Sequence, residues 1–402
     1  MSLIPRSGGP RYHLSRWSLL PALAVVAACC LAGRWGVAPS SAAAGPASAP
    51  SVADRLLARM TLQQKIAQLF MVNVDGTQPG AQLQQFVHDW KVGGLILYRA
   101  NVVSARQLRA LLAAAQREAQ IPLLVATDQE GGRVSIIPPW AGVRAMLAPS
   151  QYGSIGSADR VYQDALATGR DLRALGVNMD LAPVVDVLID PYSPIGSRSF
   201  GRNPALVARL GVAAIRGYQD AGIAATAKHF LGLGGVSIDA HRGLPTIARS
   251  LMQLSAVELP PMQAAIKAGV DALMVTHAGI PALDPSDTSA SLSRPIIDSF
   301  IRGRLGYDGL IISDSLLMGA ITGHMGVADA TVKAIAAGND IVLISGASHL
   351  TNLVRESLDA VEHAVAAGAI STATIDAAAR HVLLLKARLG LLPSPAFSHP
   401  AT

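Results

Sequence analysis

The segment KHFLGLGGVSIDAH, residues 228–241, combines chemically reactive side chains with a backbone rich in glycine. Lys228 and His229 open the segment, and Asp239 and His241 close it. Glycine allows sharp turns and a close approach of the backbone to a ligand. Polar groups gathered on such a loop are more typical of a binding or catalytic site than of a packing element. The alternative is a surface turn with incidental histidines.

The elements that must position this segment follow from short apolar runs that alternate with longer helical patterns. Eight runs read as strands, and helical patterns such as 104–119 and 204–222 lie between them. Continuous apolar runs, rather than alternating ones, indicate strands buried on both faces of a parallel sheet. We therefore predict a (β/α)₈ barrel, with an open doubly wound sheet as the alternative. No GxGxxG or Walker sequence follows the first run to favour that alternative. The eight runs are 69–74, 93–98, 122–128, 178–186, 224–230, 272–278, 310–315 and 341–345.

Polar residues recur at the carboxyl ends of these predicted strands, where the active site of such a barrel lies. A random distribution of polar residues would not select strand ends so consistently. The sequence therefore predicts one polar site at this face of the barrel. Its members are Asp128 and Glu130 after the third run, Asp186 at the end of the fourth, Lys228 and His229 at the end of the fifth, His277 at the end of the sixth and Asp314 at the end of the seventh.

The residue types exclude several chemistries. Cys29 and Cys30 are the only cysteines, so the barrel has no thiol nucleophile, thiolate metal site or disulfide. No Gly-x-Ser-x-Gly elbow and no HExxH helix is present. His229, His241 and His277 could together bind a metal ion, which stays an alternative. We expect no metal and no cofactor. A carboxylate, Asp314, facing a His–Asp pair fits displacement at a sugar carbon.

Four motifs in order carry a family resemblance. They are ATDQEGGRV (126–134), LAPVVDV with IGSRSFG (181–187 and 195–201), KHFLGLGGVSIDAH (228–241) and IISDSLLMGAI (311–321). With them, the chain resembles family 3 glycoside hydrolases, in the exported β-N-acetylhexosaminidase branch, from about residue 53 to 390.

The resemblance implies roles for the catalytic residues. Asp314 matches the nucleophile, His241 the general acid and then base, and Asp239 the carboxylate that orients the imidazole. An unperturbed histidine titrates near about 6.5, so a neighbouring carboxylate keeps part of it protonated near neutral pH. The glycine-rich loop lets this pair swing over bound substrate. Positions that match sugar-binding residues are Asp128, Arg198, Lys228 and His229.

Four further residues are candidates of a second rank. Asp186 and His277 either brace the site or touch the sugar. Glu130 and Arg133 either belong to the site or form a buried pair that supports the loop after the third strand.

The chain also departs from the family pattern. Ile136 stands where an arginine that helps to bind the sugar is usual, which puts the substrate in doubt. The other departures are Leu231, Leu233, Gly235, Ala240 and Ser315.

These observations favour hydrolysis of terminal, non-reducing β-linked N-acetylglucosamine with retention of configuration. Peptidoglycan fragments or chitin oligosaccharides would be the substrates. The alternatives are a β-glucosidase or a glycoside phosphorylase of the same family, and a carbohydrate-binding lipoprotein without catalysis.

The first fifty residues have the pattern of an export signal and a tether. Residues 1–33 read as a signal peptide or lipoprotein signal, 34–52 as a low-complexity tether, 53–392 as the barrel and 393–402 as a flexible tail. Cys29 lies in a lipobox-like sequence, with ordinary cleavage or an uncleaved anchor as alternatives. Four arginines of the leader account for most of the net charge of +6, and no basic run suggests nucleic acid. We expect an exported monomer at the outer face of a bacterial membrane, or a secreted one.

Overall fold

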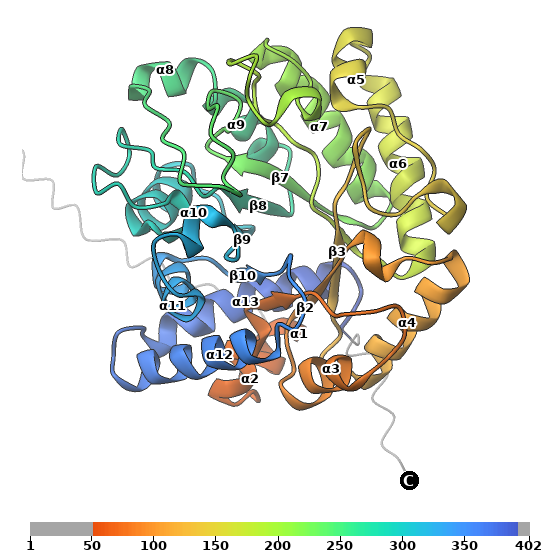
Figure 1. Ribbon diagram of the computed structural model, residues 1–402, viewed down its shortest axis with the longest axis vertical. Coiled ribbons are helices and arrows are strands. Elements are labelled where there is room, and N and C mark those ends of the chain that lie inside the picture. The colour runs from red at the N-terminus through yellow and green to blue at the C-terminus, as the bar shows by residue number, and fades with distance from the viewer. Residues whose placement is uncertain (1–50, 393–402) are drawn as a thin grey trace, which may run out of the picture. The chain divides into compact units, whose positions relative to one another are not determined.

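The computed structural model describes residues 51–392, which form a closed barrel of eight parallel strands surrounded by helices (Figure 1). Around the barrel the strand order is β1-β10-β9-β8-β7-β6-β3-β2. The register is regular between β2 and β3, where Gly94 pairs with Leu124 and Leu97 with Thr127, whereas it shifts between β7 and β8 and between β9 and β10. The strands are β1 (Phe70–Val72), β2 (Gly94–Leu97), β3 (Leu124–Thr127), β6 (Met179–Asp180), β7 (Ala224–Phe230), β8 (Ala272–Val275), β9 (Leu310–Ser315) and β10 (Ile341–Ile344).

Each predicted strand contains one barrel strand, so the (β/α)₈ prediction is confirmed and the open sheet is wrong. The largest difference is β6, which has two residues where nine were predicted. One hairpin was not predicted. It pairs β4 (Gln129–Gly131) with β5 (Val134–Ser135) in an antiparallel sheet of its own. Strands of two or three residues are too short to produce a periodic pattern.

Helices cover the outside of the barrel. The predicted helix 104–119 is α4 (Ala105–Glu118), whose Ser104 side chain caps the Gln107 amide in a reciprocal capping box. The predicted helix 204–222 is α7 (Pro204–Asp220), capped by Asn203. The other α-helices are α1 (Val52–Leu57), α2 (Leu62–Gln68), α3 (Ala81–Gln84), α5 (Pro149–Ile155), α6 (Ala158–Leu175), α8 (Leu251–Ala256), α9 (Leu259–Lys267), α10 (Gly319–Thr322), α11 (Val327–Ala337), α12 (Thr351–Ala366) and α13 (Thr372–Arg388).

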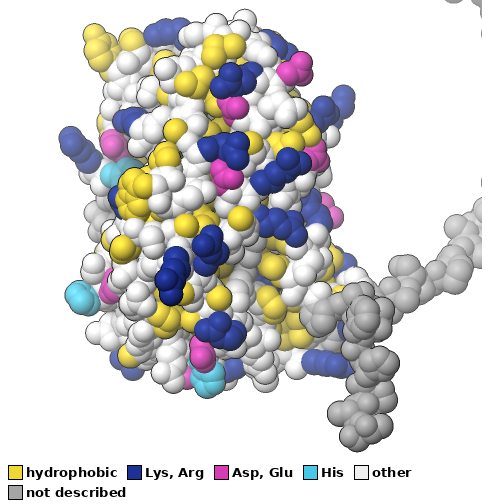
Figure 2. Space-filling model, turned by 90° about the vertical axis from the view of Figure 1, so that its right-hand side faces the viewer, with side chains coloured by type: hydrophobic (Ala, Val, Ile, Leu, Met, Phe, Trp, Pro, Cys, Tyr) yellow, Lys and Arg dark blue, Asp and Glu magenta, His cyan; other side chains and the backbone are white. Residues whose placement is uncertain are grey.

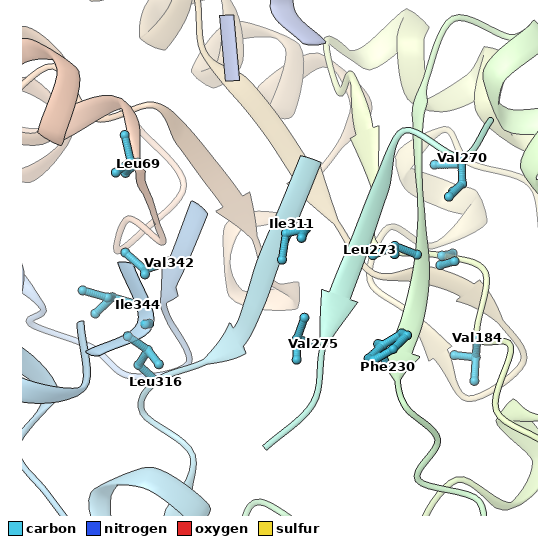
Figure 3. Close-up of a cluster of buried hydrophobic side chains, with 14 of the residues drawn as sticks. Leu69, Val184, Phe230, Val270, Leu273, Val275, Ile311, Leu316, Val342 and Ile344 are labelled. Atoms are coloured by element: carbon cyan, nitrogen blue, oxygen red, sulfur yellow. The ribbon is translucent and has the colours of Figure 1, made fainter. Parts of the chain in front are cut away.

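Alternation along the strands divides the core into two layers. On β9, Ile312 joins the cluster inside the barrel, while Ile311 joins the layer between strands and helices. Figure 3 shows part of this outer layer, with Leu273, Val275 and Phe230 on the neighbouring strands β8 and β7. The polar residues at the carboxyl ends of the strands lie on the face that points into the barrel, beyond the apolar residues of the barrel interior.

The sequence boundaries need one correction. The tether was predicted to reach residue 52, but α1 begins at Val52 and Ser51 already caps it with Asp54. The predicted signal, Cys29 and the tail 393–402 lie outside the described residues.

Within residues 51–392, no helix is long and apolar enough to cross a bilayer. The side of the molecule shown in Figure 2 is the side on which α4, α5 and α6 lie in Figure 1. Lysine and arginine outnumber acidic side chains on this face, and hydrophobic side chains are interspersed among polar ones.

Candidate active site

A cavity of about 660 Å³ opens at the carboxyl ends of the barrel strands. The structure brings most of the predicted site residues together in its wall. Among the lining residues are Asp128, Glu130, Arg133, Arg198, Lys228, His229, Asp239, His241 and Asp314. The predicted single polar site at this face is therefore present. Asp186 and His277 do not line it.

Asp314 lies near the end of β9. Its carboxylate is partly exposed and lines the cavity. Its Oδ1 accepts a hydrogen bond from the Ser315 amide at 2.8 Å. Burial works to raise the pKa of Asp314, but the neighbouring His277 and His229 outweigh it and hold the pKa below the usual value. Asp314 is therefore ionised near neutral pH, as a nucleophile must be.

A chain of alternating charges forms one wall of the cavity. Lys228 Nζ lies 2.6 Å from Asp128 Oδ1 and 2.7 Å from Glu130 Oε1. Arg198 donates two hydrogen bonds to Glu130, from Nε to Oε2 and from Nη2 to Oε1, each at 2.7 Å. Burial works to raise the pKa of Glu130, yet Lys228 and Arg198 lower it to about 2. Ion pairs thus fix these four side chains in place.

The buried Glu130–Arg133 pair considered from the sequence is wrong. Glu130 is buried, but its partners are Lys228 and Arg198. Arg133 is exposed and donates from Nη2 to the carbonyl oxygens of Pro194 and Ile195. Arg133 therefore ties the β4–β5 hairpin to the loop that carries Arg198.

His229 completes this wall and shows what Asp186 does. His229 Nδ1 lies 2.7 Å from Asp186 Oδ2, and Asp186 Oδ1 accepts from the Leu233 amide at 2.7 Å. The Asp186 side chain is completely buried. The bond from Nδ1 leaves Nε2 directed toward Arg198, whose Nη2 lies 3.4 Å away. Asp186 therefore braces the ring from behind and does not line the cavity.

His277 also braces the site. It is fully buried, with Nε2 2.8 Å from the carbonyl oxygen of Ser315 and Nδ1 2.7 Å from Ser291 Oγ. Burial lowers the pKa of His277, against the opposing charge of Asp314. A neutral ring that donates from Nε2 to Ser315 and accepts at Nδ1 from Ser291 satisfies both contacts. His277 thus fixes the backbone next to Asp314.

The predicted His–Asp pair is formed. His241 Nδ1 and the His241 amide nitrogen lie 2.8 and 3.0 Å from Asp239 Oδ1. His241 is the most open member of the site, with 71% of its side chain exposed, whereas 42% of Asp239 is exposed. The bonds from His241, above all, hold the pKa of Asp239 below its usual value despite its partial burial.

The loop that carries this pair is docked onto the segment after Asp314. The Gly319 amide donates to the His241 carbonyl at 3.2 Å, and the Ala320 amide donates to the Ala240 carbonyl at 2.9 Å. Ala240 is buried against Met318 and Ala320. A Cβ added at Gly319 would lie 2.5 Å from the His241 carbonyl oxygen. Glycine is therefore required where the two segments meet.

Two residues of the cavity, Tyr98 and Ser345, were not predicted from the sequence. They follow β2 and β10, and the Tyr98 hydroxyl lies 2.8 Å from Ser345 Oγ. Both are polar residues at strand ends, so the same rule that selected the others would have found them. Burial, with the charge of Asp128, raises the pKa of Tyr98, so the phenol keeps its proton.

Four of the departures from the family pattern line the cavity, namely Ile136, Leu233, Ala240 and Ser315. Ile136 and Leu233 make part of its wall apolar. Ser315 is buried and donates from Oγ to the Ser345 carbonyl, which joins β9 to the end of β10.

The histidines of the metal alternative have other partners. His229 and His241 each bind a carboxylate through Nδ1, and both ring nitrogens of His277 are engaged. No group of three His, Cys, Asp or Glu side chains in residues 51–392 is arranged to hold a metal ion.

A parallel eight-stranded barrel with an ionised carboxylate, a His–Asp pair and a wall of charged side chains at its carboxyl face defines a glycosidase-type site. The chain belongs to glycosyl hydrolase family 3, because the family's "Glycosyl hydrolase family 3 N terminal domain" matches residues 61–385.

Relatives and solved structures agree with this membership. The chain is 35% identical over 300 residues to a "Beta-hexosaminidase" of Xylella fastidiosa (strain M12), which covers 73% of this chain and 87% of the relative. It resembles the structure of a family 3 beta-N-acetylglucosaminidase from Paenibacillus sp., with 39% identity, a TM-score of 0.80 and coverage of 85% of this chain and 65% of that one. A glycosyl hydrolase of this family from Mycobacterium smegmatis has 34% identity, a TM-score of 0.74 and coverage of 82% and 98%.

Proposed function

We propose that the protein hydrolyses terminal, non-reducing β-linked N-acetylglucosamine residues with retention of configuration. The observation that carries the proposal is the docking of the Asp239–His241 pair beside Asp314 in one cavity. The names of the similar proteins, beta-hexosaminidase and beta-N-acetylglucosaminidase, support the choice of sugar. Peptidoglycan fragments and chitin oligosaccharides present this sugar and are the substrates that we infer.

In the first step, Asp314 attacks the anomeric carbon and forms a glycosyl ester as the bond to the leaving oxygen breaks. His241 donates the proton on Nε2 to that oxygen, while Asp239 holds Nδ1–H at 2.8 Å and stabilises the imidazolium. The neutral imidazole then takes a proton from water through Nε2. The water oxygen attacks the anomeric carbon at the same time, which breaks the ester and restores the Asp314 carboxylate.

The charged wall supplies the hydrogen bonds that hold the sugar. Lys228 uses two of its three N–H groups on Asp128 and Glu130 and retains one. Asp128, with 20% of its side chain exposed, offers its second oxygen as an acceptor for hydroxyls. Arg198 presents N–H groups next to it, and His229, whose Nδ1 is bound to Asp186, offers Nε2 as an acceptor.

Comparison of two aryl glycosides tests the proposal. Turnover of an aryl N-acetyl-β-glucosaminide at least ten times faster than the aryl β-glucoside is expected. Preference for the glucoside would support a β-glucosidase, and no turnover of either would support a carbohydrate-binding protein. Formation of a sugar 1-phosphate in phosphate buffer would show a phosphorylase.

We also propose that the protein is a lipid-anchored monomer at the outer face of the cell membrane. The lipobox-like sequence around Cys29 supports the anchor. Cys29→Ala should move the protein out of the membrane fraction and remove lipid labelling. Lipid labelling of that variant, or a dimer in size-exclusion chromatography, would contradict the respective part.

A further inference from the structure

A buried carboxyl group, Asp180 on β6, lies behind the charged wall and has no part in the mechanism above. Asp180 is completely buried. Its Oδ1 accepts a hydrogen bond from the Gln129 amide at 2.9 Å. Its Oδ2 accepts no hydrogen bond of normal geometry from the described residues, because the neighbouring Tyr218 hydroxyl, which interacts with Asp180, donates to the Gln129 carbonyl. The Oγ1 of Thr127, the residue paired with Asp180 across β3 and β6, is also buried without a partner.

No cation among residues 51–392 forms an ion pair with Asp180. The positive charge that acts on it is Lys228, which already binds Asp128 and Glu130. On the helix side lies the buried phenol of Tyr218 in α7, which burial and Asp180 keep protonated by raising its pKa. An ionised Asp180 would therefore be a third carboxylate sharing one lysine, in a place that water does not reach. A buried charge without a partner is far more costly than a neutral acid.

Asp180 accepts a hydrogen bond from Gln129, and the other polar groups of Gln129 are hydrogen-bonded as well. Its carbonyl accepts from the Tyr218 hydroxyl at 3.1 Å. Its side chain bonds the backbone of Ile137 at 3.0 and 3.1 Å. The residues on either side of Gln129 are Asp128 and Glu130, the two carboxylates that bind Lys228. Any displacement of Gln129 would therefore move both of them.

We propose that Asp180 is a positioning residue that acts as an uncharged carboxylic acid, holding the Gln129 amide so that Asp128 and Glu130 stay aligned with Lys228. Burial, together with the negative charges of Asp128 and Glu130, raises the pKa of Asp180 to about 8, against the opposing effect of the Gln129 amide and Lys228. The catalytic consequence of this role rests on the proposed function, but the protonation state of Asp180 does not.

The inference predicts opposite behaviour for two substitutions. Asp180→Asn keeps the acceptor for Gln129 and replaces the protonated oxygen with an amide of similar shape. We expect its kcat/KM on an aryl N-acetylglucosaminide at pH 6 to stay within about threefold of wild type. Asp180→Ala leaves the Gln129 amide without an acceptor, and kcat/KM should fall by roughly tenfold or more. The fall should include a higher KM, because the sugar-binding wall shifts.

Thermal unfolding between pH 5 and 8 tests the protonation state without any turnover. Across this window the folded state keeps a proton on Asp180 that the unfolded state has lost, so wild-type stability falls as pH rises. Asp180→Asn cannot titrate. Its Tm relative to wild type should therefore increase with pH, by roughly 5 °C or more from pH 5 to 8.

Asp284→Asn is the matched control. Asp284 is also buried and also accepts a backbone amide, that of Ser286 at 3.0 Å, but the Ser293 hydroxyl donates to its other oxygen. Burial works to raise the pKa of Asp284, yet these hydrogen bonds hold it below the usual value, so Asp284 does not titrate between pH 5 and 8. Its replacement should lower Tm throughout, without a relative gain as pH rises. A flat or falling Tm difference for Asp180→Asn, or an activity as low as that of Asp180→Ala, would overturn the inference. Failure of the wild type on every aryl glycoside would overturn the proposed function and leave the unfolding result to decide the state of Asp180.

Discussion

The imidazole of His241 is bound through Nδ1 to Asp239 Oδ1 at 2.8 Å, and the same oxygen holds the His241 amide at 3.0 Å. Two bonds to one carboxylate oxygen fix the ring relative to its own backbone. Since Nδ1 is occupied, Nε2 is the nitrogen that can exchange a proton with a substrate. The spacing of two residues therefore produces a complete acid/base unit on a loop.

Substitution of His241 by alanine should affect substrates according to their leaving groups. A good leaving group departs without a proton, whereas a natural disaccharide needs one. We expect His241→Ala to slow chitobiose hydrolysis by about 10²–10⁴-fold and an activated aryl glycoside far less. Asp239→Ala should show a milder loss of the same kind. Steady-state kinetics on both substrates measures this, and equal losses on both would make His241 a binding residue.

The docking of the loop can be tested apart from the imidazole. Gly319→Ala places a Cβ 2.5 Å from the His241 carbonyl oxygen and should push the loop away from Asp314. We expect a loss of roughly tenfold or more on chitobiose, with a smaller loss on the aryl glycoside. Gly243→Ala is the control, because a Cβ there meets no atom within 4 Å. If both variants behave alike, the contact at Gly319 does not position His241.

Asp314 should carry the covalent intermediate. Asp314→Ala should reduce turnover by roughly 10⁴-fold or more, because no other ionised carboxylate lies free of a partner in the cavity wall described here. A 5-fluoro glycoside should label Asp314, which peptide mass spectrometry detects. Because its pKa is lowered, the nucleophile is lost only at acidic pH. Circular dichroism should show an intact fold, and a label on another carboxylate would contradict the assignment.

The fold could be predicted from the sequence because the strands of a buried parallel sheet consist of continuous apolar runs. The sequence predicted most of the site because polar residues at strand ends meet at one face of a barrel. Tyr98 and Ser345 obey the same rule, because they are the last residues of the predicted runs 93–98 and 341–345. They were missed because the rule was applied to carboxylates, cations and histidines and not to hydroxyl groups.

Side-chain pairing could not be predicted in this way. Glu130 binds Arg198, which lies 68 positions away, and not Arg133, which lies three away. No local pattern records such a partner, because it depends on how two loops meet above the barrel. The docking of Ala240 on Ala320 and the burial of Asp180 behind Gln129 are contacts of the same kind.

The pairing of Glu130 leads to a prediction about stability. Glu130→Gln leaves Arg198 and Lys228 without their shared carboxylate, at a cost of about 3–5 kcal/mol in the free energy of unfolding. The folded pKa, about 2, lies below the ordinary value of 4.5. The ionised group thus stabilises the fold fully above pH 4.5, and that contribution is lost as pH falls toward 2. Urea unfolding at pH 7 and pH 3 should show the difference between wild type and variant shrinking at the lower pH.

Arg133→Ala, whose contacts are exposed backbone carbonyls, should cost about 1 kcal/mol or less. Equal losses for the two variants would restore Arg133 as the partner of Glu130.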